Sequence, residues 1–226
     1  MQNGTSTARQ LQIIFVSAAL LAGVGCGTVK TAYNTAYYAT AETFGVHKRD
    51  ILKKRVASAR DEQKQAGEQF QDALTKLKAM YAFDGGEIEK HYKQLESEYK
   101  ESEAKAEAVR DRITGVEAVA GALFEEWERE IEEIQTVNLK VKSKSAMLET
   151  KTRYNSLVTA LKKAEASMDP VLTKFKDHVL FLKHNLNAAA IASLKGEAIN
   201  IQEEITKLIA DMNTSIARAD EFIRNL

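Results

Sequence analysis

Apolar residues recur at alternating spacings of four and three along most of the chain, a pattern typical of long helices that pack side by side. The first run of this kind occupies positions 52, 56, 59, 63, 66, 70, 73, 77 and 80, and Gln63 is its only polar member. Further runs extend over residues 88–127, 154–186 and 191–216. The pattern therefore predicts four long helices.

Short segments rich in helix-ending residues separate these runs. Phe83-Asp84-Gly85-Gly86 combines a capping aspartate with two glycines, while Asn138 and the Asn185-Leu186-Asn187 segment supply the other connections. Short connections make consecutive helices antiparallel, so we expect an up-down-up-down bundle. Asp169-Pro170 lies inside the third run without shifting its phase, which predicts a kink or a re-capping of that helix.

Charge placement supports an antiparallel pairing of the second and third helices. Glutamates crowd the end of the second: Glu125, Glu126, Glu128, Glu130, Glu132 and Glu133. Cations open the third: Lys140, Lys142, Lys144, Lys151 and Arg153. Folding about Asn138 sets the two blocks side by side. Exposed pairs contribute about 0 to 1 kcal/mol each, so we expect them to select the register more than to stabilise it.

Composition narrows the architecture further. The 226 residues include one proline, and only six of the eleven glycines lie beyond residue 45, which is too little turn chemistry for a many-stranded fold. We therefore predict an all-α, long antiparallel coiled-coil helical bundle with no β structure, forming a single domain over residues 46–226. Lysine plus arginine and aspartate plus glutamate both number 32, so the bulk positive charge of a nucleic-acid-binding protein is missing.

The first 25 residues differ from the rest and resemble a secretory signal peptide. Arg9 lies in a short polar opening, and an apolar run over residues 13–24 leads to small residues. That run is shorter than the roughly 20 residues of a membrane-spanning helix. We expect residues 1–25 to be removed on export.

Cys26 is the only cysteine, so no disulfide can form within the chain. The stretch from Leu20 to Cys26 resembles a bacterial lipobox, although Gly23 stands where leucine is typical. We predict that Cys26 is lipidated and becomes the N-terminus; ordinary cleavage with a free Cys26, or an uncleaved anchor, are the alternatives. Because Gly27 replaces the aspartate of an inner-membrane retention signal, we expect the periplasmic face of the outer membrane in a Gram-negative source.

Residues 26–45 would join the lipid to the bundle. Tyr33, Tyr37 and Phe44 share one helical face. Aromatic side chains of this kind suit the interface between lipid and water, and they equally suit a helix that packs on the bundle.

Five cations follow this segment: Lys48, Arg49, Lys53, Lys54 and Arg55. They fit a solvated helix start, and they also fit contact with anionic head groups.

No catalytic or metal-binding pattern emerges from the sequence. The four histidines form no dense metal motif, and the chain has no glycine-rich phosphate loop and no nucleophile elbow. We therefore expect no enzyme activity, no metal and no cofactor.

Four separated segments carry a family resemblance: GVHKRDIL at residues 45–52, FDGG at 83–86, LFEEW at 123–127 and VLFLKHNLNA at 179–188. Together they resemble the bacterial family named domain of unknown function 2959. The resemblance implies a small secreted or lipid-anchored helical protein, and it supplies no substrate, cofactor or catalytic residue.

These observations favour a non-enzymatic, lipid-anchored periplasmic scaffold or spacer. Its distal tip would meet a protein partner through Asp84, Gly85, Gly86, Asn185 and Asn187. Many seam positions are alanine or serine and bury little area, so self-association through the helices is a further expectation. The alternative function is membrane shaping by a helical protein that resembles BAR or ESCRT-like proteins.

Overall fold

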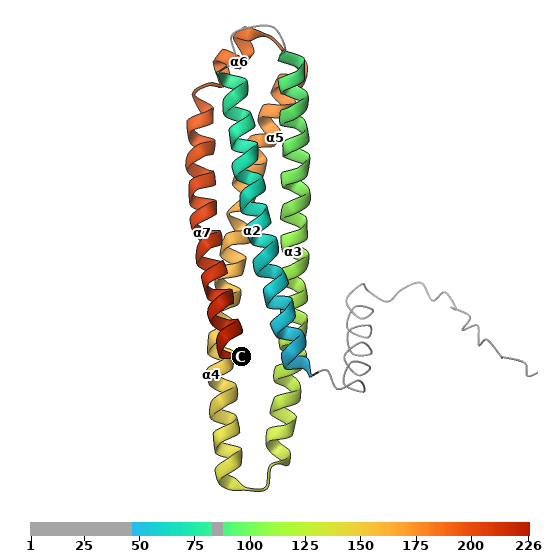
Figure 1. The fold of residues 1–226 in the computed structure, drawn as a ribbon, viewed down its shortest axis with the longest axis vertical. Helices are drawn as coiled ribbons and strands as arrows, with labels where there is room; N and C mark the ends of the chain where they lie inside the picture. Colours follow the sequence, from blue (N-terminus) through green and yellow to red (C-terminus); the bar gives the residue numbers. More distant parts are fainter. Residues whose placement is uncertain (1–46, 83–87) are drawn as a thin grey trace, which may run out of the picture.

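The computed structural model describes residues 47–82 and 88–226, and every regular element in these ranges is a helix. The helices are α2 (Lys48–Tyr81), α3 (Ile88–Glu133), α4 (Val137–Ala166), α5 (Met168–His184), α6 (Ala188–Leu194) and α7 (Glu197–Asn225). They form one elongated bundle (Figure 1). The all-α prediction is confirmed.

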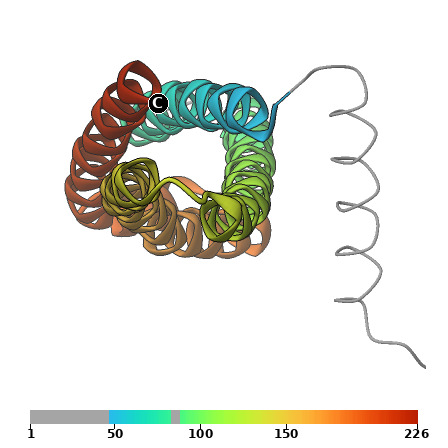
Figure 2. The same cartoon turned by 90° about the horizontal axis from the view of Figure 1, so that it is seen from below.

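Four helical columns make up this bundle: α2, α3, α4 followed by α5, and α7. Viewed along the long axis, the columns surround a common centre (Figure 2). α2 packs on α3 and α7, and α4 packs on the same two helices, so consecutive columns are neighbours and antiparallel. The predicted up-down-up-down order is therefore correct, although the third and fourth runs are each divided into two helices.

The break in the third column lies beside the single proline. α4 ends at Ala166, Ser167 intervenes, and α5 begins at Met168 with Pro170 in its first turn. Proline has no backbone N–H, and it is tolerated in the first turn because the N–H groups of a first turn have no acceptor within the helix. Because the apolar phase continues across the break, the side chains of Ala164 and Met168 are both fully buried. The structure thus divides this column into two helices at Ser167, which has helical dihedral angles and no side-chain cap.

The turn between α3 and α4 corrects the prediction made from Asn138. The turn consists of residues 134–136, and Asn138 lies in the first turn of α4. Thr136 takes the extended N-cap conformation, and its carbonyl accepts the Lys140 N–H at 2.9 Å. The Thr136 side chain makes no cap hydrogen bond, so this helix begins without the side-chain cap that asparagine was expected to supply.

At the opposite end, α6 forms a short cap between α5 and α7, and it contacts both α2 and α5. The Asn187 side chain accepts the Ala190 N–H at 2.9 Å and so begins α6. A break at Lys195 and Gly196 then separates α6 from α7. The sequence pattern missed this break because the apolar phase runs through it.

The predicted seams form the core. The bulkiest fully buried side chains come from every column, and they include Phe70, Leu95, Leu161, Phe175 and Phe222. Gln63, the polar member of the first seam, is also fully buried.

α3 and α4 extend beyond the other two columns at one end (Figure 1). An ion pair of 3.0 Å joins Lys48 to Glu126 and sets the start of α2 level with that part of α3. Arg153 donates to the Asn225 carbonyl at 3.4 Å, which sets the end of α7 level with Arg153. We call the projecting part, residues 127–146, the hairpin tip. The α2 start, the α3–α4 turn and the C-terminus therefore lie toward the same end, as the up-down-up-down order requires, but only the turn reaches the extremity.

Candidate functional site

Over residues 47–82 and 88–226, no helix combines the length and apolar character needed to cross a bilayer. The same ranges contain no group of three or more His, Cys, Asp or Glu side chains placed to hold a metal ion. The candidate sites are therefore surfaces, grooves and buried polar clusters.

Several residues singled out from the sequence lie outside the described ranges: Cys26, Tyr33, Tyr37, Asp84, Gly85 and Gly86. Asn185 and Asn187 are described, and they flank the connection between α5 and α6 at the far end, opposite the hairpin tip.

The five cations at the start of α2 have different environments. The Lys48 side chain is only 10% exposed and pairs with Glu126 across the bundle. Arg55 is half-buried and lies over α3, where a Cβ on Gly115 would come 3.9 Å from Arg55 Cδ. The remaining three, Arg49, Lys53 and Lys54, are exposed. The structure thus divides the cluster into two packed cations and three that face solvent.

A cavity of about 670 Å³ opens where α2 begins and α7 ends, beside α3 and α4. Its lining mixes apolar Leu123 and Leu226 with charged Arg49 and Glu130. The indole of Trp127 also lines it, and its Nε1 donates to Ser143 Oγ at 3.0 Å. This hydrogen bond ties α3 to α4 at the base of the hairpin tip.

The hairpin tip exposes apolar side chains at the extremity of the rod. Val137 is 76% exposed, Leu139 55% and Val141 62%. Beside them, Lys140 forms a 2.8 Å ion pair with Glu132, so one member of each predicted charge block meets its counterpart across the turn. Sequence reasoning used the lysines of this segment but missed the apolar residues between them, because they lie outside the predicted seams.

Two buried polar clusters cross the middle of the bundle. The Ser215 hydroxyl donates to Gln63 Oε1, and Gln63 Nε2 donates to the Leu161 carbonyl at 3.4 Å. These contacts join α7, α2 and α4.

The second cluster surrounds Asp211 on α7, beside the break between α4 and α5. The Asp211 carboxylate accepts from Ser167 Oγ at 2.6 Å and pairs with Lys163 Nζ at 2.8 Å. Burial alone would raise the pKa of Asp211, but the hydrogen bonds from Lys163 and Ser167 outweigh it and lower the pKa. Each interior polar group in the two clusters thus has a partner within the protein, as a structural role requires.

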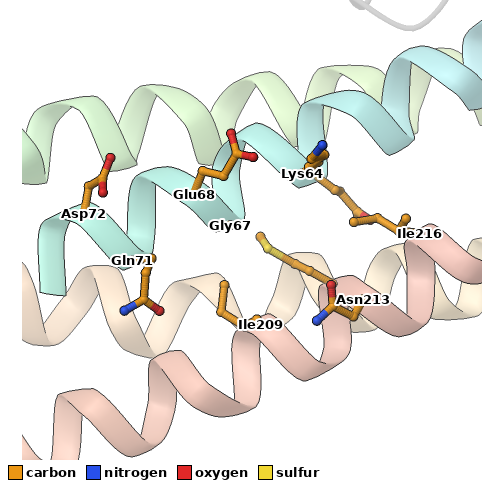
Figure 3. Close-up of a pocket in the computed structure, with 10 residues that line it drawn as sticks. Lys64, Gly67, Glu68, Gln71, Asp72, Ile209, Asn213 and Ile216 are labelled. Carbon is orange, nitrogen blue, oxygen red and sulfur yellow. The ribbon is translucent and has the colours of Figure 1, made fainter. Parts of the chain in front are cut away.

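A groove of about 580 Å³ runs between α2 and α7 (Figure 3). Gly67 allows the close approach of α7, because a Cβ there would lie 3.3 Å from both Ile209 Cδ1 and Met212 Sδ. The rim is polar, with Lys64 and Glu68 on the α2 side. Its lining residues include no histidine, serine or cysteine.

A buried tyrosine–histidine pair lies toward the far end. The Tyr81 hydroxyl hydrogen-bonds to His178 Nδ1, and the two rings meet edge to face with centroids 6.0 Å apart. Burial lowers the pKa of His178 and raises that of Tyr81, because it disfavours the charged form of each. Glu197 and Asp177 favour the histidinium, whereas Lys174 opposes it. The pair therefore joins α2 to α5 with both groups neutral near pH 7.

This pair should make stability depend on pH. Below about pH 6.5 the unfolded chain binds a proton on His178, which the folded protein resists until its lower pKa is reached. The free energy of unfolding should therefore fall as the pH is lowered from 7.5 to 5.5, and His178→Gln should flatten this dependence. Urea denaturation at several pH values measures the slope. His184→Gln, which changes an exposed histidine of the same helix, should leave the slope unchanged, and an equal slope in His178→Gln would contradict the assignment.

Comparisons with known proteins identify the family of the chain and assign no reaction to it. No curated protein gives a significant match to the chain. The family model described as a protein of unknown function (DUF2959) matches residues 37–226, which include all of the described helices. The resemblance carried by the four sequence segments is thereby confirmed, and the chain belongs to the DUF2959 family.

Proposed function

We propose that the protein is a non-enzymatic spacer or scaffold, held at the periplasmic face of the outer membrane by lipid on Cys26. The observation that carries this proposal is the direction of α2. The described chain begins at the rod end that also contains the α3–α4 turn, so a lipid on the preceding segment would hold the bundle by that end.

The length of the rod gives the proposal a physical purpose. α3, which runs from the far end to the hairpin tip, has 46 residues, which correspond to about 69 Å at 1.5 Å per residue. A bundle standing on its anchored end would therefore present Asn185 and Asn187 roughly this far from the bilayer. A protein partner at that end fits this arrangement better than a reaction, since the buried side chains of Gln63, Asp211 and His178 are each engaged by other groups of the bundle.

The decisive experiment concerns Cys26. Intact-mass analysis of protein extracted from native membranes should give a chain that begins at Cys26 and carries acyl groups. The Cys26→Ser variant should not give the mature membrane-bound form, because its side chain offers no thiol for the lipid. A wild-type chain with a free thiol, or a soluble species that begins elsewhere, would contradict the anchor.

Membrane shaping is the alternative, and the exposed apolar and cationic side chains of the hairpin tip favour some contact with lipid. Negative-stain images of the acylated protein on liposomes separate the two functions. Smooth vesicles studded with rods support a spacer, whereas tubules or ordered coats support membrane shaping.

A further inference from the structure

We propose that the hairpin tip is a second membrane contact: Val137, Leu139 and Val141 enter the lipid–water interface, while Lys142 and Lys144 meet lipid phosphates. This inference rests on the proposed lipid anchor, which determines the end of the rod that faces the bilayer.

The first supporting observation is the concentration of exposed apolar area. Single exposed apolar residues are common on protein surfaces, but here three occur within five consecutive residues at the extremity of the molecule. Ile134, in the turn between α3 and α4, adds a half-buried fourth. The four residues lie in this turn and the first two turns of α4, so a flat surface approached end-on would meet this end of the hairpin.

Reach supplies the second observation. From Glu126, level with the start of α2, α3 continues for seven residues to Glu133, or about 10 Å. Residues 27–46, which would join the lipid to α2, can span at most roughly 70 Å when fully extended. The covalent connection is therefore long enough for the tip to reach the bilayer, and the tip extends farther in that direction than α2 does.

Charge supplies the third observation. From Val137 to Leu148, α4 contains three lysines and no acidic residue. Lys140 is engaged with Glu132, whereas Lys142 and Lys144 are exposed. Lysines near an anionic surface contribute about 1 kcal/mol each. On the α3 side of the tip, exposed Glu128, Glu130 and Glu133 outnumber the exposed Arg129 and oppose this attraction. We therefore expect the apolar contact to dominate and anionic lipid to strengthen it only modestly.

A single introduced cysteine can report this contact. Because Cys26 is the only cysteine, acylation of its sulfur would leave no reactive thiol. The full acylated chain carrying Leu139→Cys would then accept one thiol-reactive fluorophore at the tip. Leu180→Cys is the matched control, since Leu180 is an exposed leucine at the opposite end of the rod. Both proteins are reconstituted in vesicles of phosphatidylethanolamine and phosphatidylglycerol at 3:1.

Nitroxide-labelled lipids should quench the fluorophore at position 139 and leave the one at position 180 unaffected. Aqueous iodide should quench position 139 several-fold less than position 180. Equal iodide quenching at the two positions would overturn the tip contact. Protection of position 139 that grows with the protein-to-lipid ratio, without quenching by lipid nitroxides, would assign the tip to a second copy of the chain and overturn it as well.

Labelling of the unsubstituted chain separates this inference from the anchor. No labelling by maleimide is expected when Cys26 carries lipid. A reactive thiol would reject the anchor and, with it, the end-on orientation, whereas an unreactive chain whose position 139 is open to iodide would reject the tip contact alone.

Discussion

Replacing Phe175 by alanine is expected to lower the free energy of unfolding by about 3 to 5 kcal/mol. The Phe175 ring is fully buried in α5, so its removal takes apolar area out of the core and leaves a cavity that long packed helices can fill only in part. Chemical denaturation followed by circular dichroism measures the change.

Phe181→Ala is the matched control for this experiment. It removes the same side chain from the same helix, but the Phe181 ring is 40% exposed. We expect a much smaller loss, within about 1 kcal/mol, because surface substitutions rarely cost more. Equal losses for the two variants would show that α5 does not pack on the core as described.

The buried contact between Gln63 and Ser215 should give the second large effect. Gln63→Leu replaces the polar side chain with an apolar one of similar size, so the Ser215 hydroxyl loses its acceptor. An unsatisfied buried polar group costs about 1 to 3 kcal/mol, so the free energy of unfolding should fall by this amount.

The double variant Gln63→Leu with Ser215→Ala provides the decisive comparison. Replacing both partners by apolar groups removes the unsatisfied hydroxyl, so most of the lost stability should return. Denaturation of the two single variants and the double variant completes the cycle. Additive losses would mean that the two side chains do not depend on each other.

The helical columns could be predicted from the sequence because the spacing of apolar residues within each run is enough to identify a helix and its buried face. The run that contains Phe70 and the run that contains Phe175 both have their apolar positions in the core. The continuous phase across Pro170 also indicated a single column. The same continuity concealed the break at Gly196, since a short interruption that preserves phase leaves no trace in the spacing.

The features that were missed depend on contacts between distant parts of the chain. Tyr81 and His178 are 97 positions apart, and no local pattern indicates that they meet. The projection of the hairpin tip depends on the axial register of α2 against α3, which is marked by the contact between Lys48 and Glu126. The apolar periodicity does not determine this register, because sliding one helix along the other by whole turns keeps the same faces in contact. The α3–α4 turn was placed at Asn138 because asparagine is the stronger N-cap residue, whereas α4 begins after Thr136, which takes the extended N-cap conformation without a side-chain cap.

The narrowing from four helices to two also has a mechanical consequence. The resistance of a rod to bending rises steeply with its thickness, so α3 and α4 alone are far more compliant than the full bundle behind them. In a rod held at the hairpin tip, a sideways force on the far end produces a bending moment that grows toward the tip, and at the level of Lys48 and Glu126 its lever is already about as long as α2. Bending would therefore concentrate in the two-helix tip beyond that level, while the four columns swing as one stiff body.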